Sequence, residues 1–218
     1  MKLFFGLAIL QVGWVPMPAL AQVEVSYYDA ENNQVKERYE TQDGLPHGRY
    51  QRYDPFGNLT QVGQFLDGEK TGLFVELHPQ SGDTLKITPY LADQVQGEVV
   101  SFYPSGQIAQ RAFFQNGLLQ GVLESFFPSG EIKGRVDFRE GKPHGIQETF
   151  YSNGQVQERT TFDQGVPEGL YQKYSEDGQL LLEKTFREGQ LEGLAIEFHA
   201  NEQKAFYVAF LICGDIFS

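Results

Sequence analysis

The chain has 218 residues, enough for one or two domains, and its 29 acidic residues against 17 Lys and Arg give a net charge of −12. This excess of acid argues against binding to nucleic acid or to anionic lipid surfaces, because both depend on clustered Lys and Arg. The one cysteine excludes an intramolecular disulfide and a thiolate metal cage. Glycine, with 24 residues, is used well above its average share of about 7%.

Residues 1–21 show the three zones of a secretory signal peptide. Lys2 supplies the positive start, and residues 3–15 form an apolar run that is short for a membrane span. The Ala-Leu-Ala sequence at 19–21 gives the small-residue pattern that precedes a cleavage site. We therefore expect cleavage before Gln22 and a protein exported to the periplasm or the cell exterior. An uncleaved amphipathic anchor is the alternative.

Most glycines after residue 21 recur with a step of 24 or 25 residues, in three series. The first series lies in sequences such as Pro-Ser-Gly, the second follows Asn or Asp in several copies, and the third stands four residues after the second. Such a period indicates a stacked array of one supersecondary unit. Because left-handed turn positions favour glycine, we predict that these residues occupy hairpin turns. The best-placed members are Gly68, Gly72, Gly106, Gly117, Gly121, Gly130, Gly141, Gly145, Gly154, Gly165, Gly169 and Gly178.

Segments of about eight residues with period-2 alternation separate the turns, which predicts strands. The fifth residue after each third-series glycine is apolar, as in Phe126, Phe150 and Tyr174. We expect these residues and Phe138 of the companion strand to form an apolar ladder on one face, opposite a polar face. Up to sixteen strands would then form an all-β fold, an elongated single-layer antiparallel meander of repeated β-hairpins.

The two ends of the array are degenerate, as expected of capping repeats. We predict a cap hairpin at 22–43, repeats at 44–201 and a closing strand at 202–218. The closing strand is apolar as far as Cys213, which we interpret as a buried small residue rather than a redox site. An apolar edge strand favours pairing with a partner or with a second copy.

The repeated unit consists of G-x-x-x-G, an aromatic residue five positions later, an S/N-G turn and then F-x-x-G. This unit resembles the MORN repeat, in its bacterial variant of about 24 residues. The resemblance covers about residues 27–214. It implies an elongated β-sheet that serves as an interaction or scaffolding module, without shared catalytic residues. Bacterial proteins of this kind are often labelled YwqK-family antitoxins, and the resemblance extends this label to the chain.

Aromatic residues at other repeat positions are expected on the face opposite the ladder, where they would form a contiguous stripe. Such a stripe would bind a protein or a glycan. The alternative is routine cross-strand packing on a partly covered face. The candidate stripe consists of Tyr50, Phe74, Tyr103, Phe127, Tyr151 and Tyr171.

Two pairs of residues have the types found in catalytic or metal sites. Glu124 and Glu148 occupy the same position in adjacent repeats, about 9.6 Å apart, which is near the upper limit for an inverting glycosidase. A varied sheet position is the favoured interpretation. His47 and His144 share a turn position eight strands apart, too far for one zinc site.

A partial calcium-loop pattern lies near the N-terminus. Asp29, Glu31, Asn33 and Glu40 have the required spacing, but Gln34 stands where that loop needs glycine. A hairpin turn explains the same residues. We therefore expect no metal site, no cofactor and no catalytic site.

These features predict an exported protein-interaction or scaffolding module whose partner is an unknown protein. The alternative is an envelope- or glycan-binding module that uses the aromatic stripe, and a glycoside hydrolase is the least favoured. No nucleic acid partner and no membrane span after residue 21 are expected.

Overall fold

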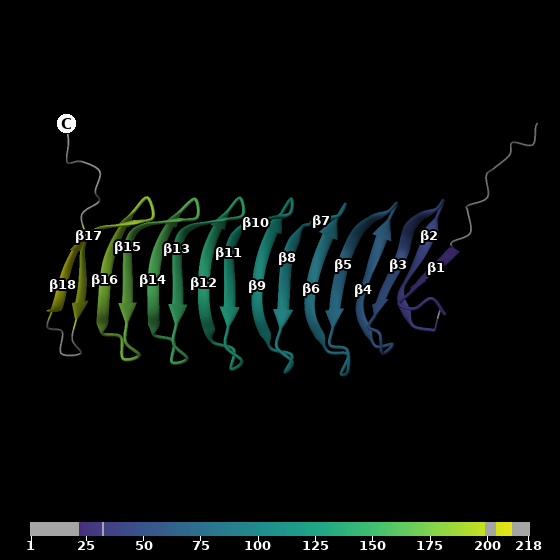
Figure 1. The fold of residues 1–218 in the computed structure, drawn as a ribbon, viewed down its shortest axis with the longest axis horizontal. Helices are drawn as coiled ribbons and strands as arrows, with labels where there is room; N and C mark the ends of the chain where they lie inside the picture. The colour runs from purple at the N-terminus through teal and green to yellow at the C-terminus, as the bar shows by residue number, and fades with distance from the viewer. Residues whose placement is uncertain (1–21, 32, 199–203, 211–218) are drawn as a thin grey trace, which may run out of the picture.

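The structure, a computed structural model, describes residues 22–31, 33–198 and 204–210. The predicted signal peptide and Cys213 lie outside these residues. The described chain folds into one antiparallel β-sheet of eighteen strands, arranged in a long single layer (Figure 1). The strands are β1 Gln22–Tyr27, β2 Val35–Gln42, β3 Leu45–Tyr53, β4 Leu59–Leu66, β5 Glu69–Leu77, β6 Thr84–Leu91, β7 Gln94–Val95, β8 Gly97–Phe102, β9 Ile108–Gln115, β10 Leu118–Leu119, β11 Gly121–Phe126, β12 Ile132–Arg139, β13 Lys142–Phe150, β14 Val156–Asp163, β15 Val166–Tyr174, β16 Leu180–Arg187, β17 Gln190–Phe198 and β18 Lys204–Phe210.

Each strand pairs with its neighbours in chain order, from β1 to β18. The two-residue strands β7 and β10 are the first parts of the strands that continue as β8 and β11, so sixteen full strands remain. The predicted all-β meander of hairpins is confirmed. The described part of the chain holds no helix that could cross a bilayer.

Two kinds of turn alternate along the sheet, one at each end of the strands (Figure 1). The second-series glycines follow a residue that also has positive φ, as in Asn116 (φ 51°) and Gly117 (φ 76°). Two successive left-handed residues make a type I′ hairpin turn, whose twist matches that of the strands. We call these turns the tips.

The first-series glycines lie in longer turns at the opposite end of the strands. Gly106 N donates to Tyr103 O at 2.8 Å, and Tyr103 N donates to Gln107 O at 2.8 Å. This is a type I turn followed by a left-handed glycine, as the Pro-Ser-Gly sequence predicts. We call these turns the loops.

The third-series glycines Gly72, Gly121, Gly145 and Gly169 lie in strands, so their assignment to turns was wrong. They have positive φ because they form bulges. In β13, Gln147 pairs with Val136 and Pro143 pairs with Phe138. Three residues of β13 therefore face one residue of β12, and the bulge sets the pairing beyond it.

The pairing register of the strands divides the side chains between two faces differently from our expectation. Phe138 pairs with Gly121 and Val136 pairs with Leu123, so both lie on the face opposite Glu124. We call the face with Glu124 the ladder face and the other the aromatic face. Phe138 and the fifth-position residues such as Phe126 therefore lie on opposite faces, and no single apolar ladder contains both.

The best-buried cluster lies on the aromatic face in the N-terminal half. The rings of Tyr50, Phe65, Phe74 and Tyr90 contact one another with centroids 5.1–5.8 Å apart. Gly63, which does not belong to the three series, leaves room for this cluster. A Cβ atom on Gly63 would lie 2.5 Å from the Phe74 ring.

Hydrogen bonds between successive units hold the array together. At the tips, Gly141 N donates to Leu119 O at 2.9 Å, and Gly165 N donates to Pro143 O at 2.7 Å. The residue before a bulge glycine adds a side-chain contact to the next tip. For example, the Gln120 Oε1 atom accepts from Glu140 N at 2.8 Å. Each unit thus depends mainly on its neighbours, as in other repeat proteins.

Candidate interaction surface

The six aromatic residues of the predicted stripe do not form one exposed surface. Tyr50 and Phe74 are only 8% and 2% exposed, because they belong to the buried aromatic cluster. Tyr171 packs edge-on against Phe186 and lies under Lys184. These three residues contribute to packing, so the prediction of a contiguous binding stripe was wrong.

Tyr103, Phe127 and Tyr151 lie at the loops. The Tyr103 hydroxyl donates to Phe126 O at 2.7 Å, and the Tyr151 hydroxyl donates to Tyr174 O at 2.9 Å. Each hydroxyl thus bonds to the carbonyl of the fifth-position residue in the next unit. The two tyrosines act as links between units, and Phe127 has the same position without the hydroxyl.

The ladder face carries a row of alternating charges across β9 and β11–β14. Register pairs place Arg111 beside Glu124, Glu124 beside Arg135, Arg135 beside Glu148 and Glu148 beside Arg159. We call these five residues the charge ladder.

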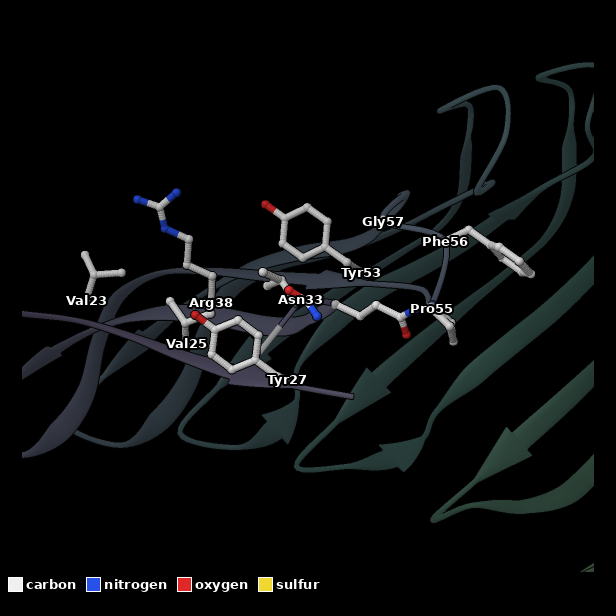
Figure 2. A pocket seen from close by; sticks show the side chains of 11 residues that line it. Val23, Val25, Tyr27, Asn33, Arg38, Tyr53, Pro55, Phe56 and Gly57 are labelled. Carbon is white, nitrogen blue, oxygen red and sulfur yellow. The ribbon is translucent and has the colours of Figure 1, made fainter. Parts of the chain in front are cut away.

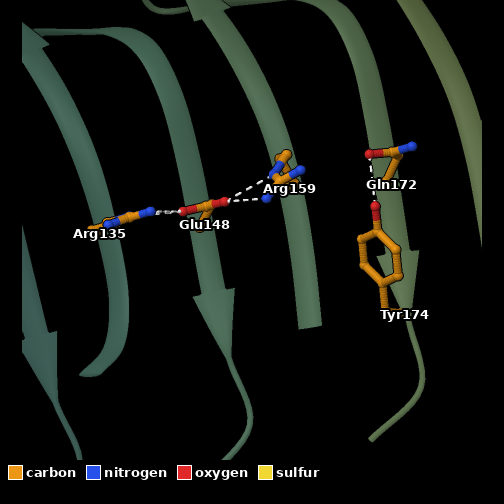
Figure 3. Close-up of polar contacts among 5 residues, drawn as sticks. All are labelled: Arg135, Glu148, Arg159, Gln172 and Tyr174. Carbon is orange, nitrogen blue, oxygen red and sulfur yellow. Dashed lines mark hydrogen bonds and ion pairs between the residues drawn. The ribbon is translucent and has the colours of Figure 1, made fainter. Parts of the chain in front are cut away.

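Glu148 is the best-connected member of the charge ladder (Figure 3). One carboxylate oxygen accepts from Arg135 Nε at 2.7 Å, and the other accepts from Arg159 Nε at 2.8 Å. Glu124 accepts from Arg111 Nε at 2.5 Å. The ladder continues with polar contacts, since Gln172 accepts from the Tyr174 hydroxyl at 2.8 Å and donates to Glu183 at 3.0 Å.

The electrostatics of Glu148 oppose an acid role in catalysis. Burial of its side chain, which is 4% exposed, acts to raise its pKa. The hydrogen bonds and positive charges of Arg135 and Arg159 outweigh burial, and the pKa falls below its usual value. A glycosidase general acid needs a raised pKa. Glu148 therefore stays ionised and serves as the centre of an ion-pair network.

An exposed aliphatic row lies beside the charge ladder on the same face. It holds the first residue after the bulge glycine in four successive units, and its members are 41–49% exposed. Register pairing places Ile146 and Glu148 on one face of β13, and Val122 and Glu124 on one face of β11. The row, named the aliphatic row below, consists of Val122, Ile146, Leu170 and Leu194.

Two members of the aliphatic row and four members of the charge ladder line a hollow of about 520 Å³ over β11–β14. These residues are Val122, Ile146, Glu124, Arg135, Glu148 and Arg159. Asp137 lies between Val122 and Ile146 in this hollow and pairs with Val122 in register. The surface therefore combines apolar side chains with the internally paired charges of the ladder and the carboxylate of Asp137. Sequence reasoning missed the arginines of the ladder, although Arg111, Arg135 and Arg159 recur every 24 residues.

His47 and His144 each have a local side-chain partner. His47 Nδ1 lies 3.2 Å from Asp67 Oδ1, and His144 Nδ1 lies 3.1 Å from Asp163 Oδ1. Within the described ranges, no group of three or more His, Cys, Asp or Glu side chains could hold a metal ion.

The residues of the calcium-like pattern are also engaged locally. Asp29 Oδ1 accepts from the backbone N–H groups of Asn33 at 2.9 Å and Gln34 at 3.3 Å, which closes a turn. Glu40 Oε2 accepts from Arg49 N at the first bulge, at 3.1 Å. The segment is thus built as a hairpin turn.

Comparison with known families identifies four repeat units. The family model described as MORN repeat variant matches residues 46–67, 95–116, 143–164 and 167–188. Each match begins two residues after a tip and ends inside the next one, in step with the observed period. No curated protein matches the chain. Repeats of this variant type are generally modules for interaction with proteins or membranes, and the chain contains at least these four units.

Proposed function

We propose that the chain is an exported, non-catalytic binding module that holds a protein partner against its ladder face. The observation that carries this proposal is the exposed aliphatic row beside the charge ladder. Four aliphatic side chains recur on every second strand, about 9.6 Å apart, and form an extended apolar line. Exposed apolar surface rimmed by polar groups is typical of interaction sites.

The charges favour a protein over a lipid surface. The arginines of the charge ladder are paired with Glu124 and Glu148, so they do not form a free basic patch. The chain as a whole carries a charge of −12 and is repelled by anionic membranes. Ion pairs that are already fixed in the free protein also reduce the ordering cost of binding.

The non-catalytic part of the proposal rests on the carboxylates. Glu148 is bonded on both oxygens, and Glu124 is bonded to Arg111. Glu148 has neither the raised pKa nor the free oxygen that an acid in glycoside hydrolysis requires.

Export and the identity of the partner are further parts of the proposal. The pattern at residues 1–21 supports secretion, which N-terminal sequencing of the protein from an envelope fraction would test by finding Gln22 first. The antitoxin label of the resembling bacterial proteins suggests one form of partner, a toxin that the module neutralises.

The test is quantitative capture of a partner from the envelope fraction of the source cells. We expect the wild-type protein to retain one protein in stoichiometric amount. The variant Ile146→Asp/Leu170→Asp should lose at least tenfold of this capture, because two adjacent apolar contacts are replaced by charges.

Leu73→Asp is the matched control, since Leu73 has the same repeat position but lies outside the aliphatic row. It should capture the partner as the wild type does. Equal loss in the control and the double variant would show that the aliphatic row is not the binding surface.

A further inference from the structure

A second hollow lies at the N-terminal end of the ladder face, several strands from the aliphatic row (Figure 2). Its volume is about 590 Å³, and β1, β2 and the loop between β3 and β4 line it. This hollow is independent of the surface assigned to the protein partner.

The walls of the hollow are mostly apolar. Val23, Val25 and Tyr27 alternate along β1 and project toward it with Tyr53 (Figure 2). Phe56 at the loop is 89% exposed and forms the outer rim. An open hollow with apolar walls can bind a hydrocarbon chain.

Arg38 is the cation of this hollow. In register it lies between Val25 of β1 and Gln51 of β3, the same row that places Arg135 between Glu124 and Glu148. Among the described residues, no carboxylate lies within ion-pair distance of Arg38. The arginines of the charge ladder have a glutamate partner, whereas Arg38 has no such partner among the described residues.

The nearby carboxylates are engaged elsewhere. Glu40 accepts from Arg49 N, and Glu37 lies on the aromatic face, where it accepts from the Tyr50 hydroxyl at 3.1 Å. A smaller hollow of about 110 Å³ adjoins Arg38 and is also lined by Arg49 and Glu40. Arg38 therefore lies beside apolar walls and can bind an anionic group of a ligand.

We propose that this hollow binds a fatty acid, with the hydrocarbon chain against Val23, Val25 and Phe56 and the carboxylate on Arg38. A single guanidinium matches one carboxylate, whereas a polyphosphate headgroup requires several cations. A peptide terminus fits less well, because its backbone amides would be covered by apolar walls without partners.

Titration of the purified protein with dodecanoate, followed by calorimetry, tests this assignment. We expect saturable binding of one molecule per chain. Arg38→Gln should weaken it roughly tenfold or more, since a charge-assisted hydrogen bond is lost. Gln51→Glu should weaken it similarly, because it supplies Arg38 with an internal carboxylate of the kind that Arg111 has in Glu124.

Arg111→Gln is the matched control, because Arg111 is already paired, and it should bind dodecanoate as the wild type does. Dodecyltrimethylammonium, with the opposite charge, should not bind. Thermal unfolding of each variant checks that it is folded. The assignment is overturned by absence of saturable binding, by unchanged affinity in Arg38→Gln, or by equal or tighter binding of an acetylated tripeptide of leucine, valine and phenylalanine.

Discussion

Glu148 shows how a charged side chain is accommodated in a single-layer sheet. Its side chain is 4% exposed, yet both oxygens are bonded to arginines that are themselves about half exposed. The arginine side chains cover the carboxylate and remain partly exposed to solvent. The charge is therefore paired without the full desolvation cost of a buried ion pair.

This arrangement predicts a pH-dependent stability. Glu148→Gln should lower the free energy of unfolding by about 1–3 kcal/mol at pH 7, because charge-assisted hydrogen bonds are lost. The pKa of Glu148 lies below its ordinary value of 4.5, so its contribution is complete above that pH and is lost as the pH falls through the lowered pKa. Urea unfolding at pH 7 and at pH 3 measures this. A difference between the variant and the wild type that is undiminished at pH 3 would contradict the ion-pair account.

Gly63 illustrates a glycine that is required for space rather than for a turn. Its φ is not in the left-handed region, and the Phe74 ring occupies the position of a side chain. Gly63→Ala should therefore destabilise the fold by about 1–3 kcal/mol through overpacking.

Replacement of the Phe74 ring provides the control. In a Phe74→Leu background, Gly63→Ala should cost clearly less, because the ring that it would contact is absent. Denaturant unfolding of the four proteins gives the coupling energy, and additive costs would show that the two residues are not in conflict.

At the scale of the element, the sequence predicted the turns well because their backbone requirements are local. Asn116-Gly117 and Pro-Ser-Gly each need left-handed residues that few side chains tolerate. The faces were predicted poorly, since alternation within one strand does not reveal a bulge in its partner. The register of β11 against β12, with its shift between Ser125 and Phe126, decides whether Phe138 and Phe126 share a face, and this register depends on pairing between strands.

The candidate site was missed for the same reason. Glu124 and Glu148 were recognised as a related pair, but their arginine partners come from strands whose register the sequence did not reveal. Likewise, the sequence placed Tyr50 and Phe74 together in the predicted stripe. Their burial depends on Gly63 of the intervening strand, which makes room for the Phe74 ring.

The hydrogen bonds of Tyr103 and Tyr151 between units predict how a hydroxyl at this loop position affects stability. Phe127→Tyr should stabilise the protein by about 0.5–1.5 kcal/mol, because the new hydroxyl can donate to the carbonyl of Phe150 as Tyr103 donates to Phe126. Tyr151→Phe should destabilise it by a similar amount, through loss of the bond to Tyr174 O. Thermal unfolding measures both changes, and a Phe127→Tyr variant less stable than the wild type would contradict the link.

At the scale of the whole molecule, contacts between neighbouring units build the array, and the described residues form no single central core. Tips contact the preceding unit, loops contact the next one, and the charge ladder crosses both kinds of boundary. Stability should then be approximately a sum over units and their interfaces. A whole unit can be removed without exposing a shared interior. Half a unit cannot be removed in this way, because the loss of one strand would reverse the direction of every strand that follows.

The removal of residues 121–144 tests this account most directly. It joins Gln120 to Gly145, keeps the period and places Arg111 beside Glu148, so the charge ladder still alternates. Small-angle X-ray scattering should show a folded particle whose longest dimension is roughly 10 Å shorter, the width of two strands. An unfolded chain, or a longest dimension that does not change, would contradict the array of interchangeable units.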